Sequence, residues 1–462
     1  MSNGRKPTTI AGDARLRIPG ITGRSIAPGD ADYDAARAVF YGGTDKHPGL
    51  IVRVADTADV VRVVTHAREH GIELAVRSGG HSAVALCSTD GGIVLDLHDM
   101  RALDIDASRR TASVQAGLTS GEYTNAAADL GLANSFGDTG SVGLGGLITG
   151  GGVGYMVRKY GLTIDDLLSA EVVTADGKVV RTDAETEPDL FWAIRGGGGN
   201  FGVVTRIQLR THEVPSTVGG ILILPATAEL IEKFVALSEA APEELTTIAN
   251  VMPAPPMPFL PEEHHGKVVI FGMLVYAGPA EDGTRALAPF RALATPLADL
   301  MKPMSYREVY PPEDPSYHPI AAGRTMFVDA VDRASAETIM EVLTERAPEF
   351  GVAQIRVLGG AMARVAPDAT AFAHRKRRIM INAAGLYERI EETAAQEAWV
   401  ERYASRLQRG ERGRYVNFLS KEGPAGIRDA YPGKTWDRLV ALKRRYDPTN
   451  LFHLNQNIPP TG

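Results

Sequence analysis

Three glycine-rich segments constrain the fold of this chain more than any other feature. The first, Arg77–Ser82, places a histidine directly after two glycines and follows the apolar run Leu74–Val76. The second, Gly140–Gly154, is the longest, and the third, Arg195–Thr205, contains four consecutive glycines. Glycine lets the main chain approach a ligand closely, and successive N–H groups in such loops can cradle a pyrophosphate. The first segment alone would also suit an ordinary turn with a surface histidine, but the three together indicate a bound cofactor.

The order of these segments resembles that of a known family. Together with Tyr415–Phe418 and Tyr446–Phe452 they resemble the berberine-bridge-enzyme-like oxidases of the vanillyl-alcohol-oxidase and p-cresol-methylhydroxylase (PCMH) superfamily. The resemblance runs from about Asp45 to Pro215 and continues more loosely to the C-terminus. It implies an FAD-linked oxidoreductase, similar to the bacterial subgroup that includes 6-hydroxy-D-nicotine oxidase.

The resemblance implies a covalently bound flavin. In that family the histidine of the first segment is bonded to the flavin 8α-methyl carbon, a role that falls to His81. Some members carry a second link from a cysteine just before the second glycine segment. Gly137–Ser141 has no cysteine, and Cys87, the one cysteine of the chain, lies elsewhere. We therefore expect a single histidyl link. The other residues that the resemblance assigns to FAD binding are Arg77, Ser78, Gly79, Gly80, Ser82, Thr139, Gly140, Ser141, Gly143, Gly145, Gly146, Gly150, Gly151, Gly202, Val204, Asn455 and Asn457.

The C-terminal motif departs from that of the carbohydrate-oxidising relatives. There it reads Tyr-x-Asn-Tyr, and the last tyrosine is the base; here Phe418 takes that place, while Tyr415 remains and can hydrogen-bond the substrate. Tyr155 is a second candidate for the pocket, or an aromatic residue packed beside the loop. Asn382 shares a strand face with Met380 and Ala384 by alternation, so it either orients the substrate or is an ordinary buried amide.

These features predict an FAD-dependent oxidase. It would take a hydride from a C–H next to an alcohol or amine of a small molecule, a secondary metabolite, and pass the electrons to O2 as H2O2. An amine needs no base, because its lone pair assists hydride loss. Two alternatives remain: a flavin-dependent oxygenase of natural-product (polyketide) tailoring, and a non-catalytic flavin or small-ligand binding protein.

Other cofactors and partners fit the sequence poorly. Gly143–Gly146 does not match the dinucleotide-binding fingerprint, and the adjacent pair His264 and His265 indicates a surface loop, so we expect no metal. The 462 residues carry a net charge of −7, and the basic run Arg375–Arg378 is interpreted as solvated charge. We expect no nucleic-acid partner, no membrane span and a cytoplasmic location. The oligomeric state stays open, with a homodimer as one possibility.

The expected fold class is α+β: a two-domain PCMH-type FAD-binding fold with an antiparallel-sheet substrate (cap) domain. The expected divisions are an N-terminal lead-in (1–44), the FAD-binding domain (45–215), the substrate domain (216–415) and a C-terminal return to the FAD domain (416–462).

Within the first domain, we expect a strand at 50–54 and then a helix that extends to His70. Thr57 is the expected cap of this helix, and Gly71 ends it. We expect strands 93–97 and 111–117 to pair antiparallel, and an Asp-Gly turn to join strands 168–174 and 178–181. The other expected elements are helices at 34–41, 120–130, 227–240, 281–293 and 334–347, and strands at 203–209, 219–224, 267–276, 354–358 and 379–384.

Overall fold

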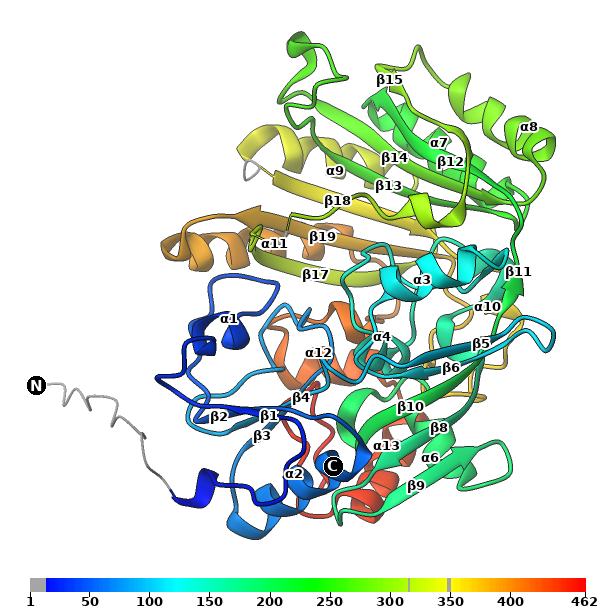
Figure 1. The fold of residues 1–462 in the computed structure, drawn as a ribbon. Coiled ribbons are helices and arrows are strands. Elements are labelled where there is room, and N and C mark those ends of the chain that lie inside the picture. The colour runs from blue at the N-terminus through cyan, green and yellow to red at the C-terminus, as the bar shows by residue number, and fades with distance from the viewer. Residues whose placement is uncertain (1–13, 315, 347–349) are drawn as a thin grey trace, which may run out of the picture.

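The computed structural model describes residues 14–314, 316–346 and 350–462, so residues 1–13 of the expected lead-in and residue 347 of an expected helix lie outside it. The molecule has a lower half, which holds β1 to β11, α12 and α13, and an upper half built on one large sheet (Figure 1). The helix and strand content and the antiparallel upper sheet agree with the expected fold class.

The first sheet of the lower half has the strand order β1-β2-β4-β3, with β2 and β3 both parallel to β4. The expected antiparallel pairing of strands 93–97 and 111–117 is therefore wrong. Every residue of β4 is buried, as in a parallel strand that is covered on both faces. The elements of this sheet are β1 (Arg24–Ile26), α1 (Tyr33–Arg37), β2 (Leu50–Arg53), α2 (Thr57–His70), β3 (Leu74–Arg77) and β4 (Ile93–Asp96).

Helix α2 begins and ends where expected but has a different cap. The Asp56 carboxylate accepts a hydrogen bond from Asp59 N at 2.9 Å, so Asp56, and not Thr57, is the N-cap. Aspartate is among the best N-cap residues, and threonine ranks below it. Gly71 ends the helix with φ +60°, a conformation that glycine adopts without strain.

The second sheet of the lower half is antiparallel, with the order β5-β6-β10-β8-β9. The expected hairpin is confirmed, because β8 pairs with β9 across the Asp-Gly turn. A two-stranded ribbon of β7 and β11 lies beside it. The elements are β5 (Leu103–Asp106), β6 (Thr111–Gln115), α3 (Ser120–Ala128), β7 (Leu132–Ala133), α4 (Leu144–Gly150), α5 (Val157–Tyr160), β8 (Leu167–Val173), β9 (Val179–Asp183), α6 (Pro188–Ile194), β10 (Val203–Arg210) and β11 (His212–Glu213).

The upper sheet runs β15-β12-β14-β13-β18-β19-β17, with β16 beside β12. Its pairings along that path are antiparallel. The four strands expected from the sequence are present, and the sequence did not predict β13, β17 or α11. The elements are β12 (Thr217–Pro225), α7 (Ala228–Ala240), β13 (Leu245–Pro253), β14 (Val268–Ala277), α8 (Ala280–Arg291), β15 (Ala298–Asp299), β16 (Lys302–Met304), β17 (Ile320–Val328), α9 (Arg333–Arg346), β18 (Phe350–Val357), α10 (Gly360–Arg364), β19 (Ile379–Tyr387) and α11 (Thr393–Leu407).

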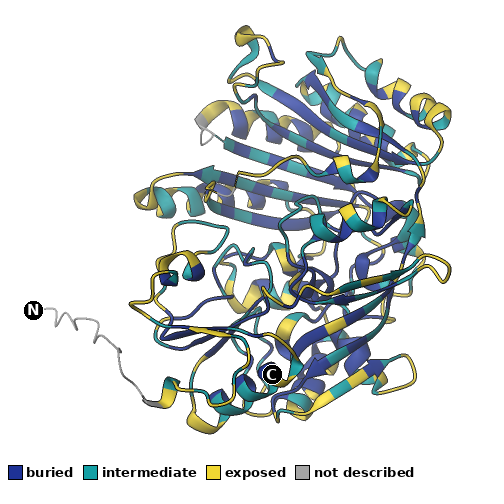
Figure 2. Ribbon diagram, in the orientation of Figure 1, coloured by how far each residue is buried: buried dark blue, intermediate teal, exposed yellow. Residues whose placement is uncertain are grey.

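The two faces of the upper sheet differ in burial. Apolar side chains of one face, among them Ala249, Ile355 and Ile381, form one core cluster with residues of α7, α8, α9 and α11. The other face carries several half-buried residues, and Figure 2 shows buried and half-buried positions alternating along these strands. This second face is therefore the one left open for a site.

The chain returns to the lower half after β19. The segment contains α12 (Gly423–Ala430) and α13 (Lys434–Tyr446), and Phe452 and Ile458 belong to the same core cluster as β2 and β4. Lys443 and Asp447 form a fully buried ion pair of 2.7 Å, and Asp447 also accepts from the N–H groups of Leu451 and Phe452. The expected domain limits stay a prediction.

Two further expectations concern single segments. Arg375 is fully buried and forms two bonds to Asp165, of 2.7 and 2.8 Å, so its interpretation as solvated charge is wrong. Burial of a guanidinium requires such a partner, and Asp165 is too distant in sequence to be recognised as one. Among the described residues no helix has the length and apolar character of a membrane span.

Candidate functional site

The first glycine segment leaves the end of β3 and is anchored by Arg77. The buried Arg77 guanidinium donates to Asp96 Oδ2 at 2.7 Å and to Ala36 O at 2.6 Å. Its side chain therefore holds β3 and β4 together, and only its backbone remains a candidate for cofactor binding. Gly80 has φ +75° and accepts from Phe40 N, while Ser82 Oγ accepts from Leu86 N.

His81 lies in a largely buried position. Its ring stacks on Phe40 with the ring centroids 4.1 Å apart, and its Nε2 lies 2.9 Å from Ser141 Oγ of the second glycine segment. Burial lowers the pKa of His81 to about 4, against an opposing effect of Glu313. The imidazole is therefore neutral at neutral pH, as a nucleophilic nitrogen must be.

The first and second glycine segments touch through their backbones. A Cβ on Gly79 would overlap the backbone of Gly143, and a Cβ on Gly143 would overlap Ser78 Oγ. Ser78 Oγ donates to Ala116 O at 2.7 Å. These glycines are explained by the contact between two protein segments. Beside them, Gly140 accepts from Gly121 N, and Thr139 is half-buried.

Three glycines of helix α4 and its end also have protein neighbours. A Cβ on Gly150 would overlap the Asn417 side chain, one on Gly151 would lie 3.0 Å from the Tyr415 ring, and one on Gly145 3.0 Å from Ala116 O. The approach of these three glycines to FAD stays a prediction, whereas the contacts of Gly150 with Asn417 and of Gly151 with Tyr415 link the second segment to the C-terminal motif.

Gly146 differs from its neighbours in α4. It is exposed although every other residue of that helix is buried, and nothing lies within 4 Å of the Cβ it would carry. The helix therefore presents bare backbone to an open space at this one position, which is the arrangement expected beside a closely bound ligand.

The third glycine segment is joined to the end of the chain. Asn200, in the short 3-10 helix Gly198–Asn200, donates to Gln456 O at 3.1 Å and accepts from Ile458 N at 2.9 Å. Asn455 Oδ1 and Asn457 Oδ1 are buried acceptors without a hydrogen-bond partner in the described part of the chain. Such acceptors need a donor, and a bound ligand could supply it. Gly202 and Val204 instead pack toward β8.

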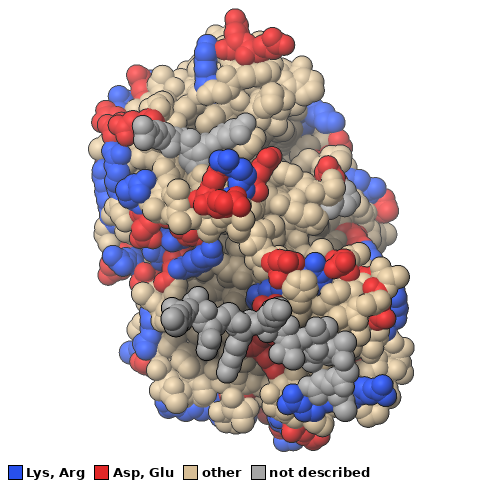
Figure 3. Space-filling model, turned by 90° about the vertical axis from the view of Figure 1, so that its left-hand side faces the viewer, with Lys and Arg blue, Asp and Glu red and all other residues tan. Residues whose placement is uncertain are grey.

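A row of polar side chains crosses the open face of the upper sheet. Asn250, Gln354, Asn382 and Thr325 are direct cross-strand partners on β13, β18, β19 and β17. Asn250, Gln354 and Asn382 are half-buried, so the row borders a space that solvent reaches. Asn382 Oδ1 has no hydrogen-bond partner among the described residues. Figure 3 shows a recess between the two halves, on a face where acidic and basic side chains are interspersed.

Arg356, which was not predicted from the sequence, lies on β18 two residues after Gln354 and on the same open face of the upper sheet. Its guanidinium forms an ion pair with Asp138 of the second glycine region and donates to Val153 O at 3.4 Å. It also donates twice to Gln354 Oε1, at 3.0 and 2.8 Å. The open face therefore meets the glycine loops at Arg356. The polar pair Gln354 and Arg356 at alternate strand positions was the signal that could have revealed it.

The two tyrosines proposed for the site are almost completely buried. Tyr415 Oη accepts from Gly152 N at 2.8 Å and from Asn417 Nδ2 at 3.1 Å. Tyr155 Oη donates to Met273 Sδ at 3.7 Å. Burial raises the pKa of Tyr415 and raises that of Tyr155 well above its usual range. Both phenols are therefore neutral at neutral pH, so they can orient a ligand but are poor bases.

Phe418 is the residue that the resemblance places where the carbohydrate-oxidising relatives have a tyrosine. Its ring packs against Tyr415, with the centroids 5.2 Å apart, and the Arg356 guanidinium lies 5.2 Å from its centroid. The structure thus brings Tyr155, Tyr415, Phe418 and Arg356 to the junction of the two halves, whereas Asn382 lies further along the polar row.

Two family models match the chain. The model described as FAD binding domain matches residues 48–183, which include the first two glycine segments and His81. The model described as berberine and berberine like matches residues 414–459, which include Tyr415, Asn455 and Asn457.

Known proteins resemble nearly the whole chain. (R)-6-hydroxynicotine oxidase of Paenarthrobacter nicotinovorans is 31% identical over 97% of this chain and 99% of its own length. Berberine bridge enzyme-like 17 of Arabidopsis thaliana is 30% identical over 89% of this chain and 85% of its own. The crystal structure of 6-hydroxy-D-nicotine oxidase from Arthrobacter nicotinovorans superposes with a TM-score of 0.85 at 28% identity, covering 95% of this chain and 98% of that one. The chain therefore belongs to the FAD-linked oxidoreductase family of (R)-6-hydroxynicotine oxidase and the berberine bridge enzyme-like proteins, and it is an FAD-linked oxidase with the PCMH-type fold.

Proposed function

We propose that this protein oxidises a small amine, or an alcohol activated by a neighbouring carbonyl or aryl group, with FAD held by a single covalent bond to His81. The observation that carries the proposal is the half-buried row Asn250, Gln354 and Asn382 on the open sheet face. It offers amide groups, and no ionised side chain, to a neutral polar substrate.

The lower half fits FAD by three independent features. Gly146 exposes helix backbone to an open space, and the Oδ1 atoms of Asn455 and Asn457 are buried acceptors without donors. His81 supplies a neutral imidazole between the first two glycine segments. FAD bound here would supply the hydride acceptor and would pass the electrons on to O2, which would be reduced to H2O2.

The residues of the site orient the substrate and do not deprotonate it. Asn382 Oδ1, which has no partner among the described residues, can accept from the N–H or O–H of the substrate. Tyr415 accepts two hydrogen bonds and keeps its own proton to donate. Phe418 has no proton to exchange, so the substrate must be one that loses a hydride without a strong base.

The flavin link is tested by His81→Ala. After acid precipitation, we expect the yellow colour to remain with the wild-type polypeptide and to be released from the variant, because alanine has no nucleophile. Intact-protein mass spectrometry measures the added mass of FAD. His98→Ala, an exposed histidine after β4, is the control and should keep its flavin. Complete release of flavin from the wild type by acid would remove the covalent link from the proposal.

The reaction is tested by mixing the protein with amines and alcohols without oxygen. Amines and activated alcohols should bleach the flavin absorbance, and admission of air should restore it with formation of H2O2. Asn382→Ala should raise the substrate concentration needed for half-maximal bleaching about tenfold, the effect of losing about 1.4 kcal/mol of binding. A flavin–oxygen spectrum that persists after air is admitted would indicate an oxygenase instead, and rapid bleaching by simple sugars would contradict the argument from Phe418.

A further inference from the structure

Glu313 joins the upper half of the molecule to the loop that faces His81. It lies between the 3-10 helix Tyr306–Val309 and β17, far in sequence from both glycine segments. Its Oε1 accepts from the backbone N–H of Ser141 at 3.0 Å, and its Oε2 contacts Ser141 Oγ. Ser141 Oγ lies in turn 2.9 Å from His81 Nε2. Glu313, Ser141 and His81 therefore form a continuous chain of hydrogen bonds.

The direction of these bonds follows from what each group can donate. An ionised carboxylate only accepts, so the hydroxyl proton of Ser141 is donated to Glu313. The oxygen of Ser141 must then accept from His81, which places the imidazole proton on Nε2. In a neutral imidazole the other nitrogen carries the lone pair. The nucleophilic nitrogen of His81 is thus Nδ1.

We propose that Glu313 and Ser141 form a proton relay that takes up the Nε2 proton of His81 when the flavin is attached. The inference rests on the covalent link proposed above and adds a positioning residue, Glu313, that the glycine motif does not contain.

The relay accounts for the atoms and electrons of the attachment. A bond forms between Nδ1 and the flavin 8α-methyl carbon, and one C–H bond of that methyl group breaks. The Nε2 proton must leave as well, because a ring alkylated at Nδ1 and still protonated at Nε2 is a cation. Two electrons remain, and the flavin takes them up. O2, the acceptor of the proposed reaction, then removes them from the flavin and is reduced to H2O2.

The surroundings of His81 explain why a relay is needed. Its ring is largely buried and stacked on Phe40, and burial disfavours its cationic form. A proton released at Nε2 therefore needs an acceptor at hand. Glu313 is exposed, so a proton that reaches it through Ser141 can pass on to solvent. Since Glu313 belongs to the upper half, attachment would require both halves to be folded and in contact.

The test compares Glu313→Gln with Asp314→Asn. The first change keeps the size and an accepting oxygen but removes the carboxylate. The second removes a carboxylate that is also exposed and whose side-chain hydrogen bonds, among the described residues, go to Ser316. Each full-length protein is prepared without flavin and mixed with FAD in air. Intact-protein mass spectrometry follows the fraction of chains that carry covalent FAD, and flavin absorbance before acid treatment reports non-covalent binding and hence folding.

We expect Glu313→Gln to bind FAD normally and to attach it on the order of 10²-fold more slowly, the effect typical of losing a general base. Asp314→Asn should match the wild type. Magnetic resonance of the wild-type flavin peptide should show linkage through Nδ1. Attachment of Glu313→Gln at the wild-type rate, or linkage through Nε2, would overturn the relay alone. Absence of covalent flavin in the wild type would overturn the His81 link and the relay with it.

Discussion

At the residue scale, Arg356 decides how the open sheet face presents its polar groups. Because its guanidinium donates to Gln354 Oε1, the Gln354 amide must turn its Nε2 toward Asn250, and it donates to Asn250 Oδ1 at 3.1 Å. Arg356 is itself held by Asp138. One buried cation thus fixes the orientation of two amides on the open sheet face, and it also lies over the Phe418 ring.

This arrangement makes Phe418→Tyr an informative change. A phenol at this position would lie beside the Arg356 guanidinium, which favours the ionised form and so a usable base. We expect the rate of anaerobic flavin reduction by unactivated alcohols to rise about 10²-fold, at the low end of general-base effects, with little change for amines. Phe418→Leu, which adds no hydroxyl, should leave the alcohol rate unchanged. Equal alcohol rates in the two variants would show that the missing tyrosine does not limit the substrate range.

At the element scale, two of the three glycines in helix α4 are glycine for different structural reasons. Gly146 faces open space and Gly150 faces the Asn417 side chain. Valine is slightly better than glycine within a helix, so Gly146→Val should leave the thermal unfolding temperature nearly unchanged. In protein prepared without flavin, it should lower the affinity for FAD about tenfold, which corresponds to a clash of about 1.4 kcal/mol. Flavin absorbance measures the binding of FAD, and melting curves measure the unfolding temperature.

Gly150→Val is the matched control, because its side chain would overlap Asn417 and should lower the unfolding temperature. Normal flavin content in Gly146→Val would show that no ligand approaches that position.

The same elements show how far the sequence could be interpreted. A close backbone approach demands glycine, so the three loops were visible in the sequence, as was the histidine that they present. Strands β13 and β17 were missed because Asn250, Gly323 and Arg324 interrupt their apolar pattern. Asn250 is also a member of the polar row, so the residue that obscured β13 is one that we propose for the substrate site. Glu313 left no sequence signal, because its role depends on a contact across the fold.

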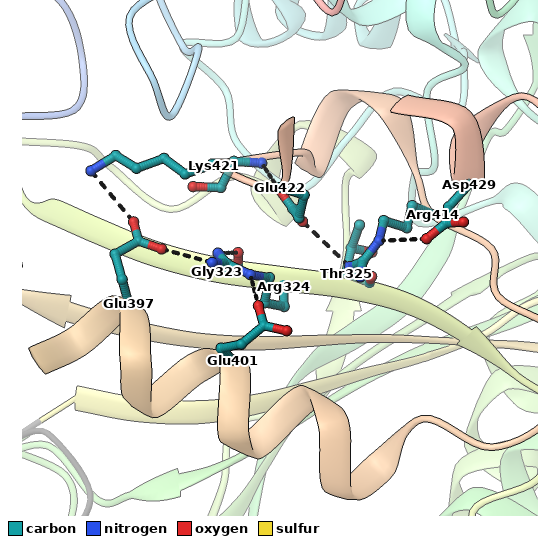
Figure 4. A network of polar contacts seen from close by, with 10 residues as sticks. Gly323, Arg324, Thr325, Glu397, Glu401, Arg414, Lys421, Glu422 and Asp429 are labelled. Carbon is teal, nitrogen blue, oxygen red and sulfur yellow. Dashed lines mark hydrogen bonds and ion pairs between the residues drawn. The ribbon is translucent and has the colours of Figure 1, made fainter. Parts of the chain in front are cut away.

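At the scale of the whole molecule, the site exists only where the two halves meet. Tyr155, Ser141 and Asp138 of the lower half contact Met273, Glu313 and Arg356 of the upper half. The halves are also joined by a charged network around Arg324 and Arg414, drawn in Figure 4. It connects β17 and α11 of the upper half with the C-terminal segment that returns to the lower half.

The network predicts that the buried Arg324 supports the contact between the two halves. Arg324 is almost fully buried and pairs with Glu397 at 3.0 Å and with Glu401 at 2.8 Å, while Lys421 lies 3.5 Å from Glu397. Arg324→Met would leave Glu397 largely buried without its closest cation. Breaking a buried pair in this way costs roughly 3–5 kcal/mol, and the exposure of Glu401 places the expected loss near the lower value.

The chain offers a matched control in Arg333→Met. Arg333 pairs with Glu232 at 2.9 Å between two helices of the upper half, but both side chains reach solvent. Such pairs contribute about 0–1 kcal/mol. Denaturant unfolding followed by tryptophan fluorescence should therefore show a much larger decrease in midpoint for Arg324→Met than for Arg333→Met. Raised salt should reduce the small decrease in midpoint caused by Arg333→Met. It should leave most of the decrease caused by Arg324→Met, because buried charges are screened less. Equal shifts in the two variants would mean that the network adds nothing beyond surface pairing, and the two halves would then be held together by their apolar contacts and the glycine loops alone.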